Sequence, residues 1–310
     1  MHIVIVGIGG VGGYFGGKIS YSGQKTTMIA RGKHLEAIQK NGLQVKSVNG
    51  DFVTHPYLVT DDMSKVEKAD LILICTKSWQ VKEAGLLIKP ILKEDTIVIP
   101  LQNGADNAGK LCAAITAKHV VGGLCKIYSK IEAPGRISHF GHPPEVVFGE
   151  LDKKDTQRVQ KVKEIFDKAG FESTISKDIQ VDVWSKFMFI ATVSGLGALT
   201  RVTIGEMYEH AGTREILRQT ALEIYNVAIA KGVALPRDIV DRIMMFISKQ
   251  SYEATASMQR DILEGRPSEL ENFNGFIVKE GEKLDVLTPV NSFIYNCLAP
   301  VEAKARKLII

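Results

Sequence analysis

The run HIVIVGIGGVG, at positions 2–12, decides the fold of this chain. A β-rich stretch over residues 2–6 leads directly into a match to the pattern G-x-G-x-x-G, which opens an amphipathic segment over residues 10–22. In that pattern the first glycine permits a tight turn, the second lets a pyrophosphate approach the backbone, and the third lets helix and strand pack closely. The run therefore predicts a dinucleotide-binding turn with phosphates held at a helix N-terminus. Its candidate cofactor-binding residues are Gly7, Ile8, Gly9, Gly10, Val11 and Gly12.

Downstream of this run, short β-rich stretches alternate with amphipathic segments, which is typical of a parallel sheet covered by helices. Asn49-Gly50 lies between two of the stretches and is a strong signal for a hairpin. The predicted strands are residues 2–6, 26–30, 43–48, 51–55, 69–75, 96–100 and 171–175, and the predicted helices are 10–22, 32–41 and 155–169.

From about residue 178 the β-branched stretches end and helical periodicity dominates. The sequence thus predicts an α/β N-terminal Rossmann-type dinucleotide-binding domain at 1–177, followed by an all-α C-terminal domain at 178–310. We expect the active site in the cleft between the two domains. The predicted helices of the second domain are 179–199, 204–231, 237–250, 252–263, 270–284 and 289–308.

The composition is that of an ordinary globular protein. Hydrophobic residues make up 45% of the chain and charged residues 24%, which suffices to bury a sizeable core. The net charge of +4 suits an anionic small molecule, and we expect no nucleic-acid partner because no basic tract is present. The four cysteines form no C-x-x-C pair, so we expect reduced intracellular thiols. No stretch reaches the ~20 apolar residues that cross a bilayer, so we expect a cytoplasmic protein without a membrane partner.

The end of the second predicted strand indicates which nicotinamide cofactor binds. An NAD site carries Asp or Glu there, whose carboxylate accepts hydrogen bonds from the ribose hydroxyls. This chain instead has Arg31 and Lys33, and no carboxylate within residues 29–33. The planar guanidinium of Arg31 suits a 2′-phosphate, so the sequence predicts NADP(H) as the cofactor. The alternative is a solvated arginine on a loop.

Two more polar stretches follow predicted strands, where ligands of α/β sheets bind. Lys77 follows the strand at 69–75 and is predicted to lie beside the cofactor groove. Asn103 follows the strand at 96–100 and is predicted to bond the nicotinamide ribose or the substrate. The alternative interpretations are a solvated helix start for Lys77 and a plain turn for Asn103.

With these features, the chain resembles the 2-dehydropantoate 2-reductase (ketopantoate reductase) family over essentially its whole length. The glycine loop, Arg31 and the stretches KSWQ at 77–80 and QNG at 102–104 look like that family's cofactor side. The stretch VWSKF at 183–187 looks like the W-x-K segment that holds the family's catalytic lysine, here Lys186. The segments that resemble its substrate and cofactor contacts are Ser257-Met258, Glu269 and NFNG at 272–275.

The resemblance implies NADPH-dependent reduction of ketopantoate to pantoate, a step towards pantothenate and coenzyme A. Lys186 is then the catalytic residue, and the domain at 178–310 supplies catalytic and substrate-binding side chains beside the NADP-binding domain at 1–177. It polarises the substrate carbonyl, which develops alkoxide character as it accepts hydride, and it donates the proton. Ser257 and Asn103 hydrogen-bond the substrate, and Glu269 orients the lysine or bonds the cofactor ribose.

Three positions depart from the family's pattern. Its best-known members carry asparagines that hold the substrate's carboxylate and hydroxyl groups, and this chain has Ile190, Ser194 and Ile204 there. Each hydrogen bond lost to a charged group costs ~1.5–3 kcal/mol, so either the substrate differs or other residues replace the amides. The polar candidates nearby are Thr192, Thr200, Arg201 and Thr203.

Two alternatives to ketopantoate reduction therefore stay open: a paralogue that reduces another 2-keto acid, and a non-catalytic NADP(H)-binding sensor. No metal site is expected, because His139 and His142 lack nearby carboxylate or Cys ligands and suit a strand and turn that end near Pro143-Pro144. The apolar stretches at 187–189 and 244–246 suit a helical core or the contact of a homodimer.

Overall fold

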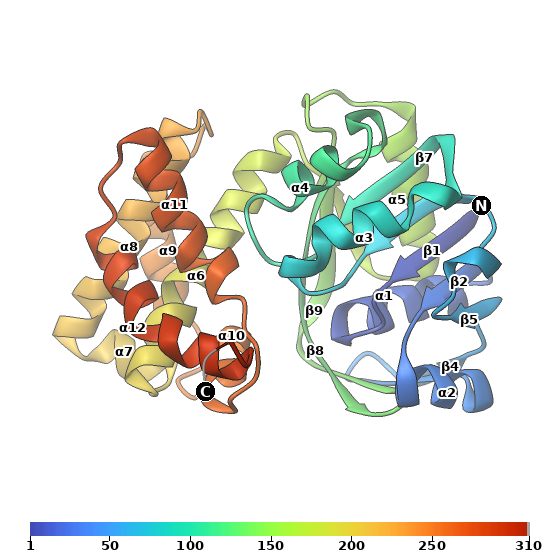
Figure 1. The fold of residues 1–310 in the computed structure, drawn as a ribbon, viewed down its shortest axis with the longest axis horizontal. Helices are drawn as coiled ribbons and strands as arrows, with labels where there is room; N and C mark the ends of the chain where they lie inside the picture. The colour runs from blue at the N-terminus through green and yellow to red at the C-terminus, as the bar shows by residue number, and fades with distance from the viewer. Residues whose placement is uncertain (309–310) are drawn as a thin grey trace. The chain divides into compact units, whose positions relative to one another are not determined.

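The computed structural model describes residues 1–308, which form two compact units. The first unit ends at Asp182 and the second begins at Val183, so that helix α6 (Ile179–Thr200) starts in the first and continues into the second. Within the described residues, every strand belongs to the first unit and the second is helical, as Figure 1 shows. The predicted fold class, an α/β domain followed by an all-α domain, is confirmed.

A parallel sheet with strand order β5-β2-β1-β6-β7 forms the centre of the first unit. In β1, Ile3 and Ile5 face one apolar core and Val4 and Val6 face another, because successive side chains of a strand point to opposite faces. All-parallel sheets are buried on both faces, which explains why these strands read as continuous apolar runs. The strands are β1 (His2–Val6), β2 (Lys25–Ile29), β5 (Leu58–Thr60), β6 (Ala69–Ile74) and β7 (Leu92–Pro100).

Helix α1 (Gly10–Tyr21) packs against both this sheet and a second one. A Cβ on Gly16 would come within 2.8 Å of Ile5 in β1, and a Cβ on Gly17 would come within 3.3 Å of Leu43 in the second sheet. Glycine costs about 1 kcal/mol relative to alanine in a helix. Here that cost is offset because two sheets can approach the same helix closely, one at Gly16 and the other at Gly17.

The second sheet is built around the long strand β9, which pairs antiparallel with β8 along one side. On its other side β9 pairs first with β3, at 136–139, and then with β10, at 145–148. The expectation that this strand ends near Pro143-Pro144 was wrong. Residues 141–144 occupy no paired position on either side, so the prolines there remove no ladder hydrogen bond. The strands are β3 (Leu43–Ser47), β4 (Phe52–Thr54), β8 (Gly122–Ala133), β9 (Arg136–Gly149) and β10 (Glu172–Ile175).

Several short elements of the first unit escaped prediction. Helices α3 (Val81–Leu87) and α4 (Asn107–Ala114) cover the face of the central sheet that carries Val4 and Val6. Each is shorter than the window of about 11 residues over which helical periodicity becomes legible. The remaining helices, α2 (Gly32–Asn41) and α5 (Gln157–Ala169), lie where the sequence predicts them.

The second unit consists of helices α6 to α12, coloured yellow-green to red in Figure 1. Residues 191–198 of α6 are all buried. Glycines let other helices approach it: a Cβ on Gly195 would come within 2.7 Å of Ile294, and one on Gly197 within 2.7 Å of Gln259. The helices after α6 are α7 (Ile204–Glu209), α8 (Ala211–Ala230), α9 (Ile239–Ser248), α10 (Ser257–Leu263), α11 (Asn274–Leu284) and α12 (Pro289–Ala305).

Two of the predicted helices of this unit are interrupted and one is shortened. The helix expected at 204–231 breaks at His210, whose extended backbone caps α8. The helix expected at 252–263 begins only at Ser257, because Tyr252 and Ala254 accept backbone hydrogen bonds from residues 204–205. The helix expected at 270–284 is split at Phe273, which separates the short 3-10 turn Leu270–Asn272 from α11.

Helix α6 also corrects the expectation that no stretch is long and apolar enough to cross a bilayer. It has 22 residues and an 18-residue window with a mean hydropathy of 1.3, which suffices by length and composition alone. That window is 61% buried inside the protein. A helix that is apolar all round is also typical of the core of a large domain.

Candidate active site

Four parallel strands end together and bring the predicted cofactor-binding residues to one edge of the central sheet. The last residues of β2, β1, β6 and β7 are in register with one another. Backbone hydrogen bonds continue this register one residue beyond the strand ends. Neighbouring strands lie about 4.8 Å apart, so residues that follow these ends leave the sheet side by side. The predicted residues within three positions of a strand end are Gly7, Ile8, Gly9, Arg31, Lys77 and Asn103.

The glycine loop lies where the strand order reverses. The chain runs from β1 outward to β2 and β5, then returns to the other side of β1 at β6. Ligands of open α/β sheets bind at such a point. Gly7 follows β1 there with a φ of +94°, and a Cβ on it would come within 2.9 Å of the backbone nitrogen of Thr76. Both the left-handed conformation and the close approach of the β6 end require glycine at this position.

The other two glycines of the motif differ in their surroundings. Gly9 is the N-cap of α1, and a Cβ on it would meet no atom within 4 Å. A Cβ on Gly12 would lie 2.1 Å from the carbonyl oxygen of Gly7. No side chain caps α1 and its first turn holds no acidic residue. The open space beside Gly9, at an uncapped helix N-terminus, fits the pyrophosphate of a dinucleotide, whereas Gly12 serves close packing.

Arg31 is the N-cap of α2 and is exposed, as is Lys33 in the first turn of that helix. His34, which sequence reasoning missed, holds this helix start against the rest of the unit. Its Nδ1 accepts the backbone N–H of Gly135 at 2.9 Å, and the Ile8 carbonyl of the glycine loop lies close to the ring. Burial lowers the pKa of His34, so the ring is neutral at pH 7.

The two other strand ends carry ordered turns. Lys77 is exposed, and its backbone N–H donates to Oε1 of Gln80 at 3.3 Å. Asn103 is half-buried in the turn after β7. Asn107 shapes that turn, because its Nδ2 donates to the carbonyls of Gln102 at 3.0 Å and Asn103 at 3.1 Å. Sequence reasoning missed Asn107, although an asparagine four residues beyond another asparagine in a turn is a weak local signal.

Aromatic packing brings the turn of α6 with Lys186 against the segment that carries Glu269. Trp184 and Phe187, on either side of the half-buried Lys186, are themselves buried. The ring centroid of Trp184 lies 5.9 Å from that of Phe276, and that of Phe187 lies 6.0 Å from that of Phe273. These partners follow Glu269 by a few residues, so the predicted lysine and carboxylate belong to two segments in direct contact.

Glu269 itself is 5% exposed and is the N-cap of the 3-10 turn Leu270–Asn272. Ser257 is the exposed first residue of α10. The segment at 272–275 departs from expectation at Asn274, which is fully buried and donates from Nδ2 to Oδ1 of Asn291 at 3.0 Å. Asn274 therefore holds helices together, and the contact of the segment at 272–275 with substrate or cofactor stays a prediction.

The three positions at which the sequence departs from the expected family pattern differ in exposure. Ile190 is half-buried, whereas Ser194 and Ile204 are 0% and 4% exposed. Of the polar candidates nearby, Thr200 donates its hydroxyl to the carbonyl of Leu196, and Arg201 is exposed at the end of α6. Thr192 is fully buried, and the hydroxyl of Thr203 caps α7.

His139 is engaged within the first unit by two hydrogen bonds. Its Nδ1 lies 2.8 Å from Oγ of Ser47, and its Nε2 lies 3.2 Å from the carbonyl oxygen of His142. In the part of the chain that the structure describes, no three His, Cys, Asp or Glu side chains gather where they could hold a metal ion.

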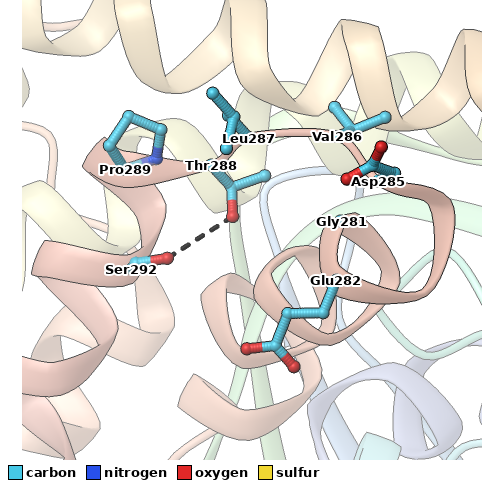
Figure 2. Close-up of a pocket in the computed structure, with 8 residues that line it drawn as sticks. All are labelled: Gly281, Glu282, Asp285, Val286, Leu287, Thr288, Pro289 and Ser292. Carbon is cyan, nitrogen blue, oxygen red and sulfur yellow. Dashed lines mark hydrogen bonds between the residues drawn. The ribbon is translucent and has the colours of Figure 1, made fainter.

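A surface pocket of about 310 Å³ lies at the turn between α11 and α12, as Figure 2 shows. Thr288 and Ser292 meet at its wall, with their hydroxyl oxygens 3.4 Å apart. None of the predicted site residues lines this pocket. Its full lining is Gly281, Glu282, Asp285, Val286, Leu287, Thr288, Pro289 and Ser292.

Comparison with known families matches both units. Residues 3–153 match the model described as "Ketopantoate reductase PanE/ApbA", and residues 178–302 match the model of the C-terminal domain of the same family. The chain belongs to the ketopantoate reductase PanE/ApbA family. The resemblance predicted from the sequence is thus confirmed, and the family places this chain among the oxidoreductases.

Individual relatives align along essentially the whole chain. The uncharacterized oxidoreductase YkpB of Bacillus subtilis is 30% identical over 98% of this chain and 100% of its own length. The 2-dehydropantoate 2-reductase of Pyrococcus horikoshii is 28% identical over 98% of this chain and 97% of its own. Among solved structures, a PanE/ApbA family ketopantoate reductase from Ralstonia eutropha JMP134 is 29% identical with a TM-score of 0.91, covering 99% of this chain and 100% of the other.

Proposed function

We propose that this ketopantoate reductase family member reduces a 2-keto acid to a 2-hydroxy acid with NADPH, and that its substrate is ketopantoate. One observation carries the proposal: an open glycine loop follows the end of β1, and the exposed Arg31 follows the adjacent end of β2. This arrangement suits a pyrophosphate beside Gly9 and a 2′-phosphate at Arg31. The relatives that bear the name 2-dehydropantoate 2-reductase support the substrate.

NADPH, when bound beside the glycine loop, would supply the hydride that the substrate's keto carbon accepts. In our proposal, Lys186 donates a hydrogen bond to the keto oxygen, stabilises the charge that develops there and gives up its proton to form the hydroxyl group. Glu269 orients Lys186 or bonds the cofactor ribose. Asn103 and Ser257 hold the substrate, and Lys77 adds positive charge beside the cofactor phosphates.

The contrast between the two glycines yields a prediction about the cofactor. Gly9→Ala is expected to raise the Kd for NADPH by about 10-fold or more, because the new methyl group fills the open space, while the melting temperature changes by less than about 2 °C. Gly12→Ala is expected to lower the melting temperature by about 5–10 °C, because its Cβ overlaps the Gly7 carbonyl. Fluorescence titration and thermal unfolding measure the two effects, and unchanged NADPH binding in Gly9→Ala would contradict the assignment of the loop.

The substrate is tested by following NADPH oxidation with ketopantoate and with a panel of other 2-keto acids. We expect kcat/KM for ketopantoate to exceed that of every other keto acid by about tenfold or more. A higher kcat/KM for another keto acid would show that this acid, and not ketopantoate, is the substrate. The proposed hydride transfer would still hold. Binding of NADPH without turnover of any keto acid would favour a sensor and refute the proposed activity.

A second candidate substrate, a different and more apolar 2-keto acid, is favoured by one observation. Ile190 lies one turn after Lys186 on α6 and is half-buried, at one of the positions that depart from the expected family pattern. An isoleucine offers contact to an aliphatic or aromatic substituent and no hydrogen bond to a hydroxyl group. Ile190→Asn separates the two candidates: improved kcat/KM for ketopantoate relative to bulkier keto acids is the expected result if Ile190 contacts substrate.

A further inference from the structure

Helix α12 presents a row of polar side chains on one face. Asn291, Tyr295, Glu302 and Arg306 are 4, 7 and 4 residues apart in sequence. With 3.6 residues per turn, these spacings place all four within an arc of roughly 60°. Each of the four makes hydrogen bonds to the segment at 268–274, which includes Glu269. The polar face of α12 thus contacts this segment at Ser268, Glu271 and Asn274.

The contacts are densest at Ser268, the residue directly before Glu269. Its backbone N–H donates to both carboxylate oxygens of Glu302, at 3.0 and 3.1 Å, and its hydroxyl donates to Oε2 at 2.5 Å. Arg306 completes the arrangement, because its Nη2 donates to the Ser268 carbonyl at 2.8 Å and its Nε to Glu302 at 2.6 Å. Ser268 is fully buried, and its N–H, carbonyl and hydroxyl are all fixed by Glu302 of α12 and by Arg306, the C-cap residue of that helix.

Two further contacts continue along the same segment. The hydroxyl of Tyr295 donates to Oε2 of Glu271 at 2.6 Å, and this hydrogen bond raises the pKa of Tyr295 to about 12. Asn291 accepts from Asn274 and donates to the buried carboxylate of Glu223 in α8 at 2.7 Å. The segment is therefore held on both sides of Glu269, at Ser268 and from Glu271 onward.

We infer that the pair Glu302–Arg306 positions Glu269 for catalysis by holding Ser268 to helix α12. This inference rests on the proposed function, in which Glu269 acts on Lys186 or the cofactor. Phe273 and Phe276 dock the far end of the segment on α6, next to Lys186. The aromatic contacts bring the segment to the lysine, and the Glu302–Arg306 pair fixes the backbone from which Glu269 projects.

The test is a double-mutant cycle between Glu302→Gln and Glu269→Gln. Gln at 302 replaces one acceptor oxygen with an NH₂ group and removes the negative charge that Arg306 faces. We expect Glu302→Gln to lower kcat by about 10- to 100-fold, with KM for the keto acid within about 3-fold, because a misplaced catalytic group costs turnover more than binding. In the Glu269→Gln background the same substitution is expected to lower kcat less than about 2-fold further, because the group it positions is already disabled.

Glu280→Gln is the matched control. Glu280 is a buried carboxylate of α11 that pairs with Lys231 and Lys283 in the same unit and makes no contact with residues 268–274 among its hydrogen bonds and ion pairs. It is expected to change kcat by less than about 2-fold, and Ser268→Thr, which keeps the hydroxyl, is expected to retain more activity than Ser268→Ala.

An equal loss of kcat from Glu302→Gln in both backgrounds would show a general structural role and overturn the inference. So would an unchanged kcat in Glu302→Gln, or in Glu269→Gln. If the unaltered protein reduces no 2-keto acid, the proposed function has failed and hydrogen exchange decides the inference. Amides at 268–272 are then expected to exchange at least about tenfold faster in Glu302→Gln than in Glu280→Gln, and equal exchange would overturn it.

Discussion

Replacing Lys186 with alanine is expected to lower kcat for 2-keto acid reduction by about 10³-fold while NADPH still binds. The ketone gains negative charge on oxygen as hydride arrives, and Lys186 is the group that we propose to stabilise this charge and supply the proton. Its side chain starts from a turn of α6 held by the buried Trp184 and Phe187, so the substitution leaves the packing of that turn in place. Steady-state kinetics and NADPH titration measure the two quantities separately.

Two further variants test whether the effect depends on proton donation and on this particular lysine. Lys186→Arg keeps a cation but is expected to remain slow, because a guanidinium does not release its proton in a protein. Lys249→Ala removes an exposed lysine at the end of α9 in the same unit and is expected to leave kcat unchanged. Turnover of Lys186→Ala within about 3-fold of the unaltered protein would refute the assigned role.

Replacing Arg31 with alanine is expected to raise the KM for NADPH by about 10- to 100-fold and to leave the KM for NADH within about 2-fold. The exposed guanidinium follows β2, and only NADPH offers a 2′-phosphate for its two parallel N–H donors. Hydrogen bonds to charged groups contribute about 1.5–3 kcal/mol each, which sets the size of the effect. The ratio of kcat/KM for the two cofactors is the measurement.

Lys40→Ala serves as the control for Arg31, because it removes an exposed cation from the last turn of the same helix. It is expected to change neither KM. The loss in Arg31→Ala is also expected to shrink as salt rises, since the interaction is between exposed charges. An equal rise of KM for NADPH and NADH would show that Arg31 supports the fold of the loop and does not bind the 2′-phosphate.

The fold was predictable where local pattern and tertiary packing agree. Residues 2–12 combine a buried strand, a turn that needs glycine and a helix start, and each part predicts the others. Prediction failed where partners distant in sequence decide. Residues 252–256 have helical periodicity, yet backbone bonds to 204–205 keep them out of a helix. The strand β9 passes through two prolines because its neighbours leave residues 141–144 unpaired.

The candidate site follows the same rule: residues in local patterns could be singled out from the sequence, and residues defined by distant contacts could not. Arg31 and Lys186 stand in local patterns of fixed spacing, so a single sequence suffices to single them out. His34, Asn107 and the pair Glu302–Arg306 have their roles only through their contacts. Glu302 reaches Ser268 across 34 residues, and no periodicity connects the two. Asn274 shows the converse, since a motif that looks like a binding segment has its amide buried among helices.

Helix α6 has a consequence for how the chain is made. Some of the side chains that cover it come from α10, α11 and α12, which are synthesised last. Because the chain is synthesised at about 5–20 residues per second, the apolar surface of α6 stays without these helices for on the order of 5–20 s. During that interval the nascent chain displays a stretch whose composition also suits a membrane-spanning helix. Chains that terminate before α12 therefore leave exposed the part of this surface that α12 covers, and exposed apolar surface of this kind makes a nascent chain prone to aggregation.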